Sequence, residues 1–176
     1  MQVANVDNQE QLKQAQQNRE RVLVKDLSAV SLLKDLSSAE LRLIGSRMKL
    51  RQLKAGTALL VQGKPVESVF FIRKGLVDIL VNNDRVAQRG SMDSLGEMSC
   101  LSGEGNASAT ARAVTPGQVW MISRRDFMDV VNAIPSLRSM MFNTITSRLQ
   151  TLSHRFSEIL KHIPHGIIKI DLQGII

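Results

Sequence analysis

The stretch LGEMSCLSGEGNASATARA, residues 95–113, contains the most informative pattern in this sequence. A Gly-Glu pair opens a short apolar turn, and small residues then lead into a strand-like segment. Gly96 allows a close backbone approach, and a turn beginning at Glu97 would present N–H groups and the positive end of a short helix to an anion. The Glu97 carboxylate itself suits a hydroxyl group that donates to it. We interpret the stretch as a loop that holds a small anion against backbone amides.

Short strand-like runs lie on both sides of the anion loop. They are Leu59–Val61, Val69–Ile72, Leu76–Val81, Val86–Ala87, Ala109–Val114 and Gln118–Ile122. Turn-forming residues such as Gly56, Pro65 and Gly117 separate them. Strands at this short, regular spacing predict a closed or two-sheet antiparallel structure, and a jelly roll removes most open edges. The predicted fold class is therefore mainly β, a double-stranded β-helix (jelly-roll) barrel with N-terminal helices and a long C-terminal helix.

Helical patterns flank the strands. Ser37 and Glu40 form a capping-box pattern ahead of an apolar stripe at Leu41, Leu43, Ile44 and Met48. After Ser123, a second helix is expected with Phe127, Val130 and Val131 on one side. Near the start of the chain, residues 7–10 also resemble a capping box, followed by a weak helical stripe.

A long helix is expected from Pro135 onward. Its apolar residues alternate in steps of three and four, at Phe142, Ile145, Leu149, Leu152, Phe156, Ile159 and Ile163. This is the a/d seam of a two-stranded coiled coil and predicts a homodimer through residues 142–163. A helix packed on its own domain is the alternative, although such a helix usually buries a wider stripe.

These patterns divide the chain into four segments. Residues 1–26 are expected to form a polar helix or a disordered arm, and residues 27–135 the barrel with its flanking helices. Residues 136–163 follow as the dimerisation helix and residues 164–176 as a tail.

The composition indicates a cytoplasmic protein. No run of 18 apolar residues occurs, and the polar N-terminus is unlike a signal peptide. The one cysteine, Cys100, excludes an internal disulfide, and we interpret it as a small buried hydrophobe rather than a nucleophile. The formal net charge is +7, but the basic residues are scattered. This favours a solvated basic surface over nucleic-acid contact, which stays open as a minor alternative.

The distribution of histidines argues against metal or catalytic chemistry. The three histidines, His154, His162 and His165, all lie in or beyond the long helix. A metal site on the barrel strands is therefore not expected, and neither is a Ser-His-Asp or Cys-His arrangement. Glu97 alone makes no general acid/base pair. We expect a protein that is not an enzyme and has no metal or cofactor.

Several motifs occur together in a fixed order. Residues 54–56 (KAG) precede Gln62-Gly63, residues 69–72 (VFFI) precede Lys74-Gly75, and residues 95–99 (LGEMS) precede residues 109–113 (ATARA). In this order they resemble the cyclic nucleotide-binding domain family, over roughly residues 30–162. The length of the loop is similar to that of the bacterial catabolite-activator branch. That branch carries a helix-turn-helix domain beyond the long helix, and this sequence shows none, so we do not expect direct DNA binding.

The resemblance implies a role for each residue of the loop, which corresponds to the family's phosphate-binding cassette. Glu97, between Gly96 and Met98, would accept a hydrogen bond from the ribose 2′-hydroxyl group. Ser108 would supply a hydroxyl group. Its amide, together with that of Ala109, would face the phosphate.

The resemblance also implies the rest of the pocket. Ile79 and Ala87 would line its apolar wall. Leu152 and Ser153 of the long helix would contact the base, either within one chain or across the dimer. The implied ligand is a cyclic nucleotide, cAMP or cGMP, or a related small anion.

The sequence departs from the family at one decisive position. The family's phosphate-binding arginine should precede Ser108, where this chain has Ala107. Removing one partner of a buried charge pair costs about 2–5 kcal/mol. Arg89, near the expected pocket, and Arg148, on the long helix, are candidate replacement cations, although each is also consistent with a solvent-facing arginine.

The sequence leaves two functions open. The domain is either a regulatory sensor of a nucleotide or a degenerate fold that acts as a dimeric protein-interaction module. The presence of Glu97 and Ser108 favours the sensor, and Ala107 favours the interaction module.

Overall fold

The computed structural model describes residues 3–101, 105–144, 146, 147 and 150. The chain divides into two compact units, Met1–Met141 and Phe142–Ile176, and the fold of the first is described below.

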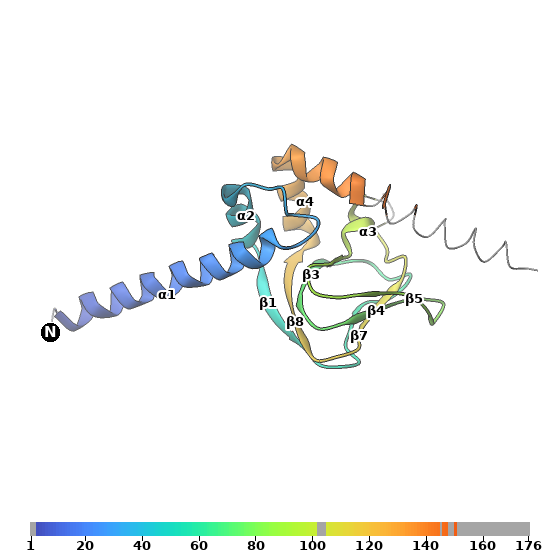
Figure 1. The fold of residues 1–176 in the computed structure, drawn as a ribbon, viewed down its shortest axis with the longest axis horizontal. Helices are drawn as coiled ribbons and strands as arrows, with labels where there is room; N and C mark the ends of the chain where they lie inside the picture. Colours follow the sequence, from blue (N-terminus) through green and yellow to red (C-terminus); the bar gives the residue numbers. More distant parts are fainter. Residues whose placement is uncertain (1–2, 102–104, 145, 148–149, 151–176) are drawn as a thin grey trace, which may run out of the picture. The chain divides into compact units, whose positions relative to one another are not determined.

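Eight strands form two four-stranded antiparallel sheets (Figure 1). They are β1 (Lys49–Leu53), β2 (Ala58–Leu60), β3 (Ser68–Lys74), β4 (Val77–Val81), β5 (Asp84–Arg89), β6 (Ser94–Leu95), β7 (Thr110–Ala113) and β8 (Gly117–Ser123). The first sheet has the order β1-β8-β3-β6 and the second β2-β7-β4-β5, so the chain passes repeatedly between the sheets. The predicted jelly roll is confirmed.

Six of the eight strands coincide with the runs expected from the sequence. The sequence pattern did not reveal β1 and β6. Four of the five residues of β1 are exposed, so this strand shows no apolar alternation, although it pairs fully with β8 from Lys49–Met121 to Leu53–Gly117. Strand β6 is only two residues long, too short for any period to be visible.

Four helices have defined bounds: α1 (Val3–Ser28), α2 (Ser38–Gly45), α3 (Glu97–Leu101) and α4 (Arg124–Ala133). The predicted capping box is present at α2, where the hydroxyl of Ser37 accepts from the Glu40 amide and the Glu40 carboxylate accepts from the Ser37 amide at 2.7 Å. Hydrogen bonds that the Ser37 hydroxyl and the Ser37 amide donate to the Glu40 carboxylate lower the pKa of Glu40 from its ordinary value. Ser123 caps α4 by accepting from the Asp126 amide at 3.1 Å. Residues 135–144 are again helical.

Two helix expectations need correction. Residues 7–10 lie inside the continuous helix α1 and start no helix. The stripe expected to reach Met48 ends early, because α2 stops at Gly45 and Leu43 is 39% exposed. Only Leu41, Ile44 and Gly45 of this helix are buried, which is one turn of apolar face.

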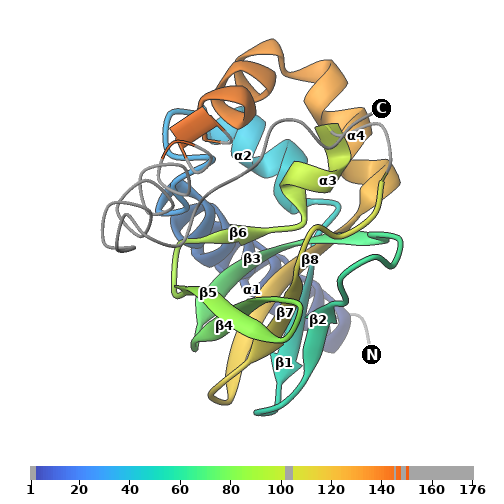
Figure 2. The ribbon, with the colours of Figure 1, turned by 90° about the vertical axis from the view of Figure 1, so that its right-hand side faces the viewer.

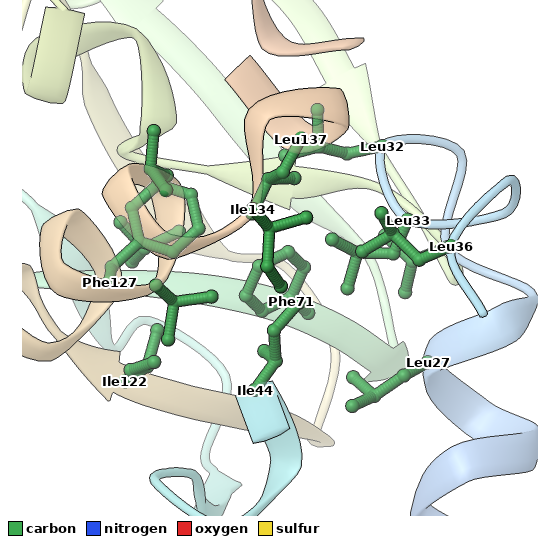
Figure 3. Packing of buried hydrophobic residues seen from close by; sticks show 14 of the residues in the cluster. Leu27, Leu32, Leu33, Leu36, Ile44, Phe71, Ile122, Phe127, Ile134 and Leu137 are labelled. Carbon is green, nitrogen blue, oxygen red and sulfur yellow. The ribbon is translucent and has the colours of Figure 1, made fainter. Parts of the chain in front are cut away.

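Strand β3 separates two apolar clusters. Successive side chains of a strand point to opposite faces, so Val69 and Phe71 pack toward the helices while Phe70 and Ile72 pack between the sheets. Figure 3 shows Phe71 between Ile134 and Ile44 in the helix-side cluster. The helix-side cluster therefore joins α1, α2 and α4 to one face of the first sheet.

Helix α3 lies where these layers meet. It directly follows β6 and lies beside α4 at one end of the sandwich (Figure 2). Its Cys100 belongs to the helix-side cluster and is 7% exposed, as expected for a small buried hydrophobe.

The predicted coiled-coil seam falls largely outside the described residues. Of its seven apolar positions, only the side chain of Phe142 is described, and it is 67% exposed.

Candidate ligand-binding site

The described residues 95–101 and 105–109, here called the cassette, begin with a sharp turn at Gly96. Strand β6 pairs with β3 through Leu95–Phe70, and the backbone then adopts a φ of +88° at Gly96. A Cβ at this position would lie 3.0 Å from the Ser68 carbonyl oxygen and 3.3 Å from Cγ1 of Val66. Both the left-handed conformation and the close approach require glycine here. The turn starts α3 immediately after the strand.

The first residue of α3, Glu97, is buried. Only 1% of the residue is exposed, although carboxylates are seldom buried so fully. Because α3 has only five residues, its dipole contributes little to an anion site. Burial raises the pKa of the neighbouring Cys100 thiol to about 11, while the charge of Arg124 lowers this pKa and that of Glu97 raises it. The charges of Arg124 and Glu97 therefore both influence a side chain of α3.

The second half of the cassette, residues 105–109, is here called the return arm. The Ala107 amide donates to the Lys64 carbonyl at 2.9 Å, and the Ala107 carbonyl accepts from the Gly63 amide at 2.8 Å. The Gly105 carbonyl accepts from the Val66 amide at 2.9 Å. These bonds hold the arm in place and occupy the Ala107 amide. The Ser108 residue that follows is exposed, and its amide donates to no other described residue.

The predicted apolar wall comes together in the second sheet. Ile79 lies opposite Ala87 on one side and Ala111 on the other. Directly opposed residues share a face of the sheet, and Ala111 belongs to the cluster between the sheets. Ile79 and Ala87 therefore lie on the inner face. Ala111 completes this wall and was missed, although its place in residues 109–113 could have suggested it.

The register separates Arg89 from the return arm. Thr110, at the start of β7, lies opposite Leu80, whereas Arg89 lies opposite Val77 beside Ala113. Three residues of strand separate these rows, which corresponds to about 10 Å. Arg148, Leu152 and Ser153 lie outside the residues whose side chains are described, so their roles remain predictions. Met98 is half-buried beside Glu97.

A cationic residue that the sequence analysis did not single out lies at the cassette. Nη1 of Arg124 donates to the Gly105 carbonyl at 3.4 Å, and the Arg124 backbone amide donates to the Glu67 carbonyl at 2.8 Å. In the sequence Arg124 follows a helix cap 19 residues after Gly105. No local pattern connects these two positions.

The described residues contain no group of three or more His, Cys, Asp or Glu side chains placed to hold a metal ion. None of the helices in the described part of the chain is long and apolar enough to cross a membrane.

The fold defines a class, a jelly-roll barrel with a short helix that begins at a buried glutamate between its sixth and seventh strands. Residues 50–133 match the family profile described as the cyclic nucleotide-binding domain. The resemblance to the cyclic nucleotide-binding domain family inferred from the motifs is thus confirmed over residues 50–133.

Relatives with this domain are much longer than the matched region. An uncharacterized NTE family protein of Mycobacterium tuberculosis is 28% identical over 125 residues, which cover 70% of this chain and 21% of that protein. The Pycsar effector protein PaPycTIR of Pseudomonas aeruginosa is 30% identical over 100 residues, covering 57% of this chain and 32% of that protein. The chain thus spans between a fifth and a third of the length of these curated relatives.

Solved structures share the fold at low identity. The structure of cAMP-bound PfPKA-R matches with a TM-score of 0.69 and 19% identity over 78% of this chain and 47% of that chain. The sensor domain of the transcriptional regulator DNR from Pseudomonas aeruginosa matches with a TM-score of 0.62 and 20% identity, over 72% of this chain and 92% of that chain. These likenesses establish the jelly-roll architecture.

Proposed function

We propose that this domain is a regulatory sensor that binds cAMP or cGMP in the cassette. The burial of Glu97 is the observation that carries the proposal. A carboxylate that is 1% exposed at the start of α3 is suited to accept from a ligand hydroxyl group, which we assign to the ribose 2′-hydroxyl. The Ser108 amide and hydroxyl, on the return arm, would bind the phosphate. Ile79 and Ala87 would contact the sugar and base.

Two of the similar proteins support this ligand class. The PfPKA-R structure is described as bound to cAMP, and a Toxoplasma gondii relative is described as a cGMP-dependent protein kinase. The role of the domain would be binding rather than catalysis. Ligand would shift the domain between two conformations in proportion to its differential affinity for them.

The most direct screen is thermal unfolding with cAMP, cGMP and cyclic dinucleotides. A ligand at about 100 times its dissociation constant adds about 2.7 kcal/mol to the free energy of unfolding. We expect a rise in Tm of several degrees with at least one cyclic mononucleotide. No shift with any of these compounds would contradict the sensor function.

One observation favours a second function. Ala107 is 5% exposed and its backbone groups bond within the protein, so it offers an anion neither a charge nor an amide. A domain of this kind could serve as a protein-interaction module without a nucleotide. Failure of the ligand screen together with a stable homodimer would favour this second function.

Dimerisation through residues 142–163 is part of both proposals. The exposed Phe142 side chain supports it, because an apolar seam position is expected to be covered by a partner helix. Sedimentation equilibrium should give the mass of two chains, and Phe142→Asp should shift the equilibrium toward monomer. A monomer at all concentrations would contradict the predicted seam.

A further inference from the structure

The return arm contacts a cationic side chain from another element. The Gly105 carbonyl, which already accepts from the Val66 amide, also accepts from Nη1 of Arg124 at 3.4 Å. Gly105 has a φ of +69°, and a Cβ there would overlap the Arg124 guanidinium. The glycine thus leaves room for the guanidinium against the backbone of the arm. The Arg124 amide, bonded to the Glu67 carbonyl, fixes the start of the side chain.

The position of the Arg124 guanidinium allows its charge to act on an anion bound at the return arm. The residue is half-buried, and it forms no ion pair with any described carboxylate. The positive charge of Arg124 also acts on α3, where it lowers the pKa of the Cys100 thiol. Two peptide units separate Gly105 from Ala107, a span of at most about 7 Å. The guanidinium therefore lies within about 10 Å of Ala107, the residue before Ser108, and partial burial weakens screening over this distance.

We propose that Arg124 supplies the positive charge that lets the cassette accept an anionic ligand. Neither the acidic side chain of Glu97 nor the alanine at position 107 supplies a positive charge to a phosphate. Arg124 supplies one from behind the return arm. This inference rests on the proposed function and adds to it the source of the site's positive charge.

Other cations in the described part of the chain fit this role less well. Arg89 lies three rows along the second sheet from Thr110 and, among the described residues, makes no hydrogen bond to the return arm, whereas Arg124 does. The Lys64 residue, which pairs with Ala107 through its backbone, is exposed, so its ammonium group is strongly screened. Arg125, next to Arg124 in the chain, is also exposed. Arg125 provides a matched control because its substitution removes the same charge from the same helix end.

The test compares a charged and a neutral ligand. Calorimetric titrations with cAMP, cGMP and adenosine are carried out on the unsubstituted chain, Arg124→Gln and Arg125→Gln, at low and at physiological salt. Arg124→Gln should weaken binding of the cyclic nucleotide about tenfold while leaving adenosine unchanged. The loss should be larger at low salt, and Arg125→Gln should change neither affinity. Adding Ala107→Arg to Arg124→Gln should restore cyclic-nucleotide binding.

Three results would overturn the inference. One is an unchanged affinity of Arg124→Gln for the cyclic nucleotide. Another is an equal loss for adenosine and cyclic nucleotide, which would mean that Arg124 only shapes the arm. The third is a large loss of affinity in Arg124→Lys. This variant keeps the positive charge, and it also provides a test if Arg124→Gln folds poorly. Because this variant keeps the charge, it should stay within about threefold of the unsubstituted chain, and a loss of tenfold or more would argue against a charge effect. If the unsubstituted chain binds no cyclic nucleotide, the proposed function fails, and this inference fails with it.

Discussion

At the residue scale, the start of the cassette depends on the backbone of Gly96. Its φ of +88° turns the chain from β6 into α3, and the Ser68 carbonyl lies where a side chain would begin. Glu97 is therefore placed by its neighbour: the turn directs the first residue of α3 into the interior. The position of the Glu97 carboxylate therefore depends directly on the backbone conformation of Gly96.

We expect Gly96→Ala to lower the free energy of unfolding by about 1–3 kcal/mol and to weaken ligand binding. The left-handed conformation disfavours a Cβ, and the contact at 3.0 Å adds to the strain. Gly56→Ala is the matched control, since Gly56 has a φ of +83° with no atom within 4 Å of the added Cβ. Chemical denaturation measures both variants. Equal losses in the two would show that the contact with Ser68 is unimportant.

The Cys100 thiol gives a pH-dependent prediction. Its pKa rises from 9.0 to about 11 in the folded protein, mainly because of burial. Between pH 9 and pH 11 the unfolded chain loses this proton while the folded chain keeps it, so stability falls as the pH rises through this window. Cys100→Ala should lack that component of the pH dependence. Identical pH profiles, or rapid alkylation of the folded protein at pH 8, would contradict the buried neutral thiol.

At the element scale, α1 is fastened to the first sheet near its C-terminal end. The Asp26 carboxylate accepts from Nε of Arg73 at 2.7 Å and from Nε1 of Trp120 at 3.3 Å. Leu27, the next residue, is fully buried in the helix-side cluster. Most of α1 before this point is exposed, so these contacts hold the helix in place.

We expect Asp26→Asn to destabilise the first unit by about 1–2 kcal/mol. The substitution removes the carboxylate charge, and with it the partly buried ion pair with Arg73 and the charged acceptor of the Trp120 hydrogen bond. Trp120 is the only tryptophan in the chain, so its fluorescence reports the change directly. Asp35→Asn, at an exposed position of the following segment, is the control. An unchanged emission spectrum and unchanged stability in Asp26→Asn would mean that this contact does not hold α1.

Elements with a strong local period could be predicted from the sequence, and contacts between distant segments could not. The six longer runs of β-type residues, the cap at Ser37 and the buried face of α4 are local features. Strand β1 has no apolar alternation, so its pairing with β8 becomes visible only in the closed sheet.

The same distinction between local features and distant contacts applies to the residues of the candidate site. The sequence indicated Gly96 and Glu97 through their motif, and the wall residues Ile79 and Ala87 through the family resemblance. Arg124 meets Gly105 only because the start of α4 and the return arm lie together in the fold, and no sequence spacing encodes that contact.

At the scale of the whole first unit, the cassette and the helices share one apolar cluster. Cys100 of α3 packs in the same cluster as Phe127 of α4 and Phe71 of β3. A ligand that moved α3 would therefore have to repack this cluster, because close-packed interiors transmit displacement. This gives the proposed sensor a physical route from the cassette to α4.

The central claim is that Glu97 binds the ribose 2′-hydroxyl group of a cyclic nucleotide. The measurement that tests it most directly is a calorimetric cycle with cAMP and 2′-deoxy-cAMP on the unsubstituted chain and on Glu97→Gln. A hydrogen bond to a charged group contributes about 1.5–3 kcal/mol. The unsubstituted chain should therefore prefer the ribose form roughly 10- to 150-fold. Glu97→Gln should abolish most of that preference. A preference of equal size in both proteins, or none in the unsubstituted chain, would contradict this account.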